Sequence, residues 1–82
     1  MKKVAIVTGG AKGIGFGSAN QLLEAGFSVA LFDIDEAGLA KAKSELANYG
    51  DQVIAFKVDV ANEKEIEEAI AKVASHFGHI DA

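Results

Sequence analysis

The residues best suited to binding a ligand are the glycines between Thr8 and Gly15, a segment that reads Thr-Gly-Gly-Ala-Lys-Gly-Ile-Gly. A short apolar run precedes this segment, and a stretch of helical character follows it. In that setting glycine allows backbone angles closed to other residues and lets the main chain approach a pyrophosphate. The N–H groups and the positive end of the following helix then face the anion. The segment therefore predicts a phosphate-binding loop. The alternative is a tight turn that binds nothing.

An acidic residue, Asp33, closes the next apolar run and lies 18 positions beyond Gly15. A carboxylate at that place can accept hydrogen bonds from the ribose hydroxyls of adenosine, and it repels a 2′-phosphate. Two other phosphate loops do not match. Lys12 is not followed by Ser or Thr, as a nucleoside-triphosphate P-loop requires, and Ser18 stands where the ordinary dinucleotide pattern has its third glycine.

The spacing Thr8-Gly9, three residues, Gly13, one residue, Gly15 resembles the cofactor motif of the short-chain dehydrogenase/reductase family. Asp33 at the end of the second apolar run and Asp59-Val60 at the end of the third follow in that family's register, so the resemblance spans the whole chain. It implies cofactor-binding roles at these positions: Gly9, Lys12, Gly13, Ile14, Gly15, Asp33, Ile34, Asp59 and Val60.

Within that set, the resemblance implies that the loop residues line the ribose and the pyrophosphate. Asp59 would meet the adenine amino group and Val60 the adenine ring, which Ile34 would flank from the other side. A basic residue at Lys12 serves the 2′-phosphate in family members that use NADP. One flexible lysine is the weaker influence beside the carboxylate of Asp33, so we expect NAD, with NADP less favoured.

The catalytic residues of that family are absent from the sequence. The family uses a Tyr four residues before a Lys, whereas the single tyrosine here, Tyr49, is followed at that spacing by Val53. We therefore expect no catalysis by this chain alone. A full-length parent would transfer hydride between NAD(H) and a small alcohol or ketone. The residues from Met1 to Ala5 and the position of Asp33 are also similar to bacterial acetoin and butanediol reductases.

The elements that must position these residues alternate between strand and helix. Apolar runs at 4–7, 28–32 and 53–60 indicate strands. Helices are expected from Ile14 to Gly26, from Asp35 or Glu36 to near Gly50, and behind a capping box of Asn62 and Glu65 as far as Gly78. In this third helix, an apolar face of Ile66, Ile70, Val73 and Phe77 is expected.

This order predicts an α/β fold, a Rossmann-type βαβαβα unit that forms the first half of a doubly wound parallel sheet. Residues 1–82 would be one dinucleotide-binding domain. Residues 79–82 stand where a fourth strand should begin, so the domain reads as truncated before that strand. The apolar strand 4–7 would then be an open edge, which favours self-association. The other interpretation is that the 82 residues are part of a longer protein.

Composition narrows the function classes. The chain has 82 residues, a net charge of −4, no arginine and no cysteine. A mildly acidic chain without a basic cluster is not expected to bind nucleic acid or a membrane, and we expect a cytoplasmic location. No metal site is expected, because cysteine is absent and two histidines are too few for a structural site made of His alone. His76 and His79 are expected at the surface.

Three other interpretations remain at this point. The first is a catalytically silent nucleotide-binding or regulatory module of the same fold. The second is a methyltransferase that uses S-adenosylmethionine, which the sequence disfavours because Thr8 stands where that class has an acid. The third is a structural fragment that binds nothing. Fold class alone does not separate them.

Overall fold

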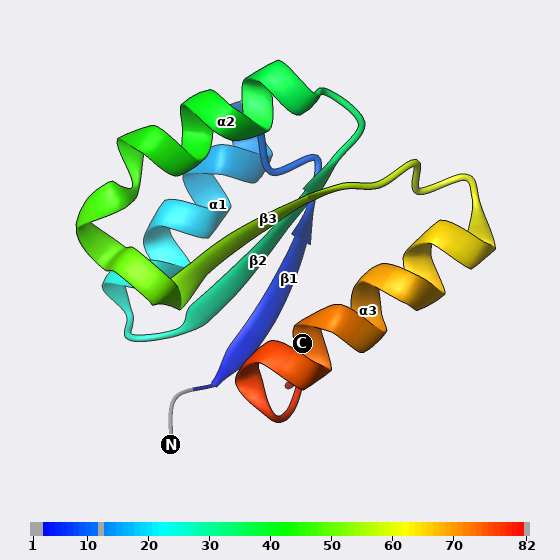
Figure 1. The fold of residues 1–82 in the computed structure, drawn as a ribbon. Coiled ribbons are helices and arrows are strands. Elements are labelled where there is room, and N and C mark those ends of the chain that lie inside the picture. The colour runs from blue at the N-terminus through cyan, green and yellow to red at the C-terminus, as the bar shows by residue number, and fades with distance from the viewer. Residues whose placement is uncertain (1–2, 12, 82) are drawn as a thin grey trace.

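The computed structural model describes residues 3–11 and 13–81 and shows a three-stranded parallel sheet between two layers of helices (Figure 1). The strands are β1 (Val4–Thr8), β2 (Ser28–Asp33) and β3 (Val53–Lys57), in the order β1-β2-β3. The helices are α1 (Gly13–Glu24), α2 (Glu36–Glu45) and α3 (Glu63–Phe77), and a 3₁₀ segment, η1 (Ala47–Gln52), follows α2. The predicted α/β class and parallel sheet are confirmed.

The central strand, β2, separates two hydrophobic cores. Its successive side chains point to opposite faces of the sheet, as in any strand. Val29 and Leu31 belong to a core that α1 and α2 cover, whereas Ala30 and Phe32 belong to a second core beneath α3. All four side chains are at most 1% exposed. This double burial explains why the strand is a continuous apolar run in the sequence.

The chain crosses the sheet from β1 to β3 and then returns in the opposite direction. The units β1-α1-β2 and β2-α2-β3 build the sheet outward with both helices on one face. Helix α3 then packs on the other face and carries the chain back to β1 (Figure 1). There the Asp81 N–H donates to the Val4 carbonyl oxygen at 2.9 Å, and the Val4 N–H donates to Asp81 Oδ2 at 2.8 Å. Such a reversal is where open α/β sheets bind ligands, at the carboxyl ends of the strands.

Two predicted boundaries were wrong. The second helix does not continue to Gly50, because α2 ends at Glu45 and the chain tightens into η1, where Gly50 has a φ of 57°. The third strand does not reach Val60, because β3 ends at Lys57. Its partner β2 ends at Asp33, whose carbonyl oxygen accepts the last bond, from the Val58 N–H at 3.0 Å. Beyond that point the chain has no neighbouring strand to pair with.

Helix α3 is capped as its sequence suggests, with one difference. The Asn62 side chain accepts from the N–H groups of Lys64 and Glu65, and Gly78 ends the helix in a left-handed conformation. Glu65 does not complete the predicted capping box. The Asn62 N–H already donates to the Asp59 carbonyl oxygen, so Glu65 accepts from the Asp59 N–H instead, at 3.3 Å.

The buried face of α3 also differs from the predicted one. Its buried residues are Ala69 and Val73, and Ile70 is 39% exposed. Ile66 and Phe77 pack against the second core as partly buried residues.

Among the helices described, none is long and apolar enough to cross a membrane.

Candidate functional site at the carboxyl ends of the strands

The glycine loop between β1 and α1 is tied to the end of the neighbouring strand. The N–H groups of Gly9 and Gly10 both donate to the Phe32 carbonyl oxygen, at 2.7 and 3.3 Å. Gly9 has a φ of 67°, which favours glycine. A side chain at Gly15 would place its Cβ 2.0 Å from the Gly9 carbonyl oxygen. The first turn of α1 therefore packs directly on the loop backbone, and only glycine allows this approach.

Asp33 stands at the end of β2 and accepts hydrogen bonds from both sides. Its Oδ2 accepts from the Ala11 N–H in the glycine loop at 3.1 Å. Its Oδ1 accepts from the Asp35 N–H at 3.1 Å, which forms a local turn. One carboxylate therefore joins the glycine loop to the turn that leads into α2. The contact with the loop was not anticipated from the sequence.

The turn after β3 holds the second acidic residue of the site. Asp59 Oδ1 accepts from the Ala61 N–H at 3.0 Å, and its main-chain N–H donates to Glu65 Oε1. The turn is therefore attached to the first turn of α3. Glu65 therefore contributes to the site by holding the Asp59 turn, whereas the sequence indicated only a role in helix capping.

A hollow of about 150 Å³ lies between the glycine loop, the end of β2 and the turn after β3. Three apolar side chains along this edge are exposed: Ile14 by 90%, Ile34 by 61% and Val60 by 53%. Exposed apolar groups beside converging polar groups are typical of a ligand site. The hollow is lined by Gly9, Asp33, Ile34, Val58, Asp59 and Val60.

Five of the nine predicted cofactor residues thus line one hollow. Gly13 borders an adjacent hollow of about 380 Å³, between the glycine loop and α2. Ile14 projects into solvent from the start of α1. Gly15 forms the contact with Gly9 beneath the loop. Lys12 lies outside the described residues.

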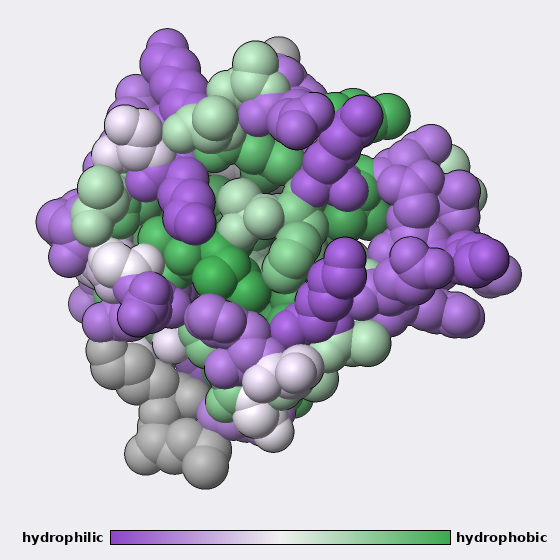
Figure 2. Space-filling view, in the orientation of Figure 1, coloured by the Kyte–Doolittle hydropathy of each residue, from purple (hydrophilic) through white to green (hydrophobic). Residues whose placement is uncertain are grey.

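A wider hollow, of about 650 Å³, lies along the outer edge of β3 between α2 and α3. Figure 2 looks onto this edge and shows apolar residues in the hollow, surrounded by hydrophilic ones. It includes Val53 and Gly50 at the amino end of β3, away from the glycine loop. Because ligands of open α/β sheets bind at the carboxyl ends of strands, we place the site at the smaller hollow.

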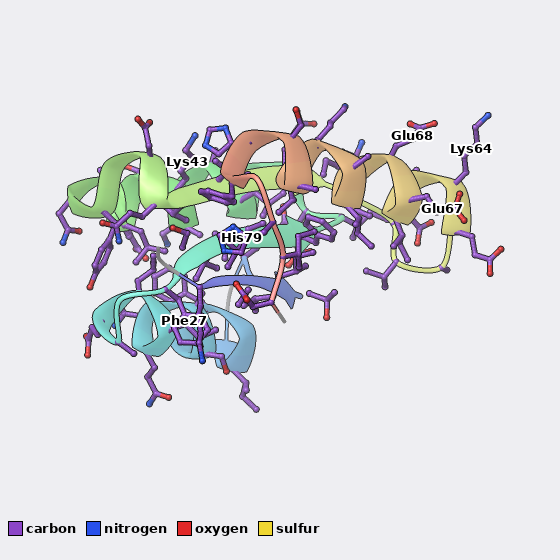
Figure 3. The ribbon with its side chains drawn as sticks, turned by 90° about the horizontal axis from the view of Figure 1, so that it is seen from below. Phe27, Lys43, Lys64, Glu67, Glu68 and His79 are labelled. Atoms are coloured by element: carbon purple, nitrogen blue, oxygen red, sulfur yellow. The ribbon has the colours of Figure 1, made fainter. Side chains whose placement is uncertain are left out.

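The histidines differ from each other in their surroundings. His76 is exposed, as predicted. The prediction for His79 was wrong, because its side chain is 27% exposed and its Nε2 lies 3.1 Å from Asp81 Oδ2. Figure 3 shows His79 beside the strands, whereas Lys64, Glu67 and Glu68 point away from α3 into solvent. Within residues 3–11 and 13–81, no group of three His, Asp or Glu side chains could hold a metal ion.

Tyr49 lies at the other end of the sheet from the site. It belongs to η1, which leads into the amino end of β3. Its ring packs against the first core, which contains Leu46. The glycine loop and the hollow lie at the carboxyl ends of the strands. Tyr49 is therefore a packing residue.

The comparisons with known proteins agree with this geometry. The family model for short chain dehydrogenases matches residues 3–82, so the chain belongs to the short-chain dehydrogenase/reductase family. A diacetyl reductase of the (S)-acetoin-forming type, from Staphylococcus epidermidis, is 43% identical over 81 residues, which are 99% of this chain and 32% of that protein.

Two solved structures show the same fold with different cofactors. A short-chain dehydrogenase/reductase from Burkholderia phymatum in complex with NAD has a TM-score of 0.91 and 30% identity, covering 96% of this chain and 28% of the other. An actinorhodin polyketide ketoreductase variant with NADPH has a TM-score of 0.91 and 34% identity, covering 98% and 31%. The chain spans about a third of the length of these relatives. It therefore has an NAD(P)-binding Rossmann fold.

Proposed function

We propose that the chain binds NAD(H) through the adenosine and pyrophosphate half of the cofactor. The observation that carries the proposal is the convergence of three strand ends on one hollow, next to a loop that a Cβ at Gly15 would disrupt. The residues present fit an adenosine diphosphate group. The N–H groups at the start of α1 suit the pyrophosphate, a carboxylate suits the ribose, and exposed apolar side chains suit the adenine.

Each predicted site residue that the structure describes has a role in this proposal. The backbone at Gly9, Gly13 and Ile14 binds the ribose and pyrophosphate, and Gly15 keeps the loop close to α1. Ile34 and Val60, both more than half exposed, cover the two faces of the adenine. Asp59, held by its bond to the Ala61 N–H, accepts from the adenine amino group.

We propose NAD rather than NADP because two carboxylates lie where a 2′-phosphate would enter. Asp33 lines the hollow itself. Asp35 caps α2 by accepting from the Gly38 N–H at 3.0 Å, so it occupies a donor that could otherwise bind an anion. Both carboxylates repel a phosphate dianion, whereas Asp33 attracts the hydroxyls of an unmodified ribose.

The variant Asp33→Ala tests this assignment. We expect NAD affinity to fall by about 1–3 kcal/mol, the cost of losing hydrogen bonds to a charged group. We also expect the preference over NADP to narrow, since the repulsion is reduced. Titration calorimetry with both cofactors measures the ratio, and Asp81→Ala, which removes a carboxylate far from the hollow, is the control. An unchanged NAD/NADP ratio would contradict the assignment.

In the whole protein, we propose that the cofactor serves hydride transfer between NAD(H) and an alcohol or carbonyl carbon. The support is membership of the family and the identity of 43% to a diacetyl reductase. The nicotinamide supplies or accepts the hydride, and the proton-transferring residues lie outside these 82 residues. The chain alone should therefore give no reduced cofactor from NAD and a secondary alcohol, which absorbance would detect.

A requirement for cellular NAD(H) makes the cytoplasm the proposed location.

We also propose that residues 1–82 form the first half of a doubly wound domain. Asp81 already bonds to Val4 beside β1, and the relatives are about three times as long. In the 82-residue chain β1 is an edge of the sheet, so the proposal includes self-association through that edge. Light scattering should show a mass above the monomer. A soluble monomer at micromolar concentration would contradict the self-association.

A further inference from the structure

The last two residues of β2, Phe32 and Asp33, bind the segments that follow β1 and β3. The Phe32 carbonyl oxygen accepts from Gly9 and Gly10, and the Asp33 carbonyl oxygen accepts from Val58. These main-chain bonds fix the beginning of the glycine loop and the end of β3. They are independent of the side chain at position 33.

The middle of the glycine loop is held differently, through a side chain. The Ala11 N–H donates to Asp33 Oδ2 at 3.1 Å, and the Asp35 N–H donates to Oδ1 of the same carboxylate at 3.1 Å. Ala11 is only 7% exposed and belongs to the core under α1 and α2. Its N–H is therefore poorly placed to bond to water if the carboxylate is removed, and a buried donor without an acceptor is costly.

We propose that Asp33 is a positioning residue for the glycine loop in addition to its contact with the ribose. One carboxylate fixes Ala11 on the phosphate side and Asp35 on the α2 side, so it sets the distance between the pyrophosphate loop and the adenosine hollow. Substitutions at Asp33 that change cofactor preference therefore also loosen the phosphate loop. Two experiments test this inference. The first measures nucleotide binding and rests on the proposed nucleotide site, whereas the second measures hydrogen exchange without ligand and does not.

The first experiment compares ADP with 2′,3′-dideoxy-ADP, which lacks the hydroxyls that Asp33 would bind. Asp33→Asn and Asp33→Ala lose the same charge, but Asn keeps one oxygen for a backbone N–H and Ala keeps none. If Asp33 acts only through the hydroxyls, both variants bind the dideoxy ligand equally. If it also positions the loop, Asp33→Ala should bind that ligand about five- to tenfold more weakly than Asp33→Asn.

A matched control removes another carboxylate that accepts from a backbone N–H. Asp81→Ala loses the bond to Val4 at the amino end of β1, the end of the strand opposite to the loop. It should bind both nucleotides as the unmodified protein does. Equal affinity of the dideoxy ligand for Asp33→Ala and Asp33→Asn, each shown to be folded, would overturn the positioning role.

The second experiment measures amide hydrogen exchange in the same variants. In Asp33→Ala, the Ala11 N–H should exchange at least about tenfold faster, because its acceptor is gone. The Gly9 and Val58 amides should change little, because they donate to main-chain oxygens. Unchanged exchange at Ala11 would overturn the inference. Faster exchange at Ala11 in a protein that binds no nucleotide would support the positioning role and reject the proposed function.

Discussion

Helices α1 and α3 lie on opposite faces of the sheet and are stabilised in opposite ways. Helix α3 has a side-chain cap at Asn62, acidic residues in its first turn and a left-handed Gly78 at its end. Helix α1 begins with Gly13 and contains Gly15 and Gly17, with no acidic residue in its first turn and no basic residue in its last. Gly15 and Gly17, inside the helix, each cost helix stability relative to alanine, whereas Gly13 has a φ of 64°, which favours glycine.

The difference follows from what each helix faces. Helix α3 covers a core and contacts the site through the Glu65 side chain, which requires no close backbone approach, so local signals can favour it without conflict. The first turn of α1 must let the loop backbone approach, and Gly15 lies against Gly9 for that reason. The absence of a carboxylate from that turn also leaves the positive end of the helix to an external anion. Helix α1 therefore depends on packing, and it sacrifices intrinsic stability for the site.

Among variants of the two helices, Gly15→Val in α1 is expected to have the largest effect on stability and binding. Its Cβ would lie 2.0 Å from the Gly9 carbonyl oxygen, so the loop or the helix must move. We expect the free energy of unfolding to fall by about 3 kcal/mol, as for a strongly overpacked site, and nucleotide binding to be lost. Denaturant unfolding and calorimetry measure the two effects.

The matched control is Gly17→Val, because no atom lies within 4 Å of a Cβ at that position in the same helix. It should leave nucleotide binding intact. Retained binding in Gly15→Val would mean that the close approach of loop and helix is not required.

A smaller loss is expected at the capped helix from Asn62→Ala. The Asn62 oxygen accepts from Lys64 and Glu65 at 3.1 and 3.2 Å, and losing such a cap costs about 1 kcal/mol. Thermal unfolding followed by circular dichroism should show the loss, and Asn62→Asp, which keeps the oxygen, should restore it. If Asn62→Ala were neutral, the stability of α3 would not depend on its cap.

The smallest effect, and one of opposite sign, is expected from Gly17→Ala. Alanine fits the open space at this exposed position and favours the helix, so stability should rise by about 0.5–1 kcal/mol. Nucleotide affinity should not change. A destabilised Gly17→Ala protein would show that this glycine, like Gly15, is required by packing.

The sequence predicts the order and type of the elements well, because turn glycines and apolar runs are local signals. It also identifies the strand ends that hold Asp33 and Asp59, since carboxyl ends of parallel strands meet at one edge. Boundaries are predicted less well. The length of β3 depends on where β2 ends, and the end of α2 depends on how the chain turns at Gly50.

The hydrogen bonds within the site were beyond sequence reasoning for the same reason. The bond from Ala11 to Asp33 joins residues 22 positions apart, and the bond from Asp59 to Glu65 replaces a local cap. The partial burial of His79 arises from the return of the chain to β1, where Asp81 is its partner. Each of these contacts depends on tertiary placement.

The central claim is that the hollow at the strand ends binds the adenosine half of NAD. Its most direct test is a calorimetric titration of the folded protein with AMP, NAD and NADP. The account predicts saturable binding of AMP and NAD at one site, with NADP weaker than NAD because of Asp33. A folded protein that shows no saturable binding of either AMP or NAD would contradict it.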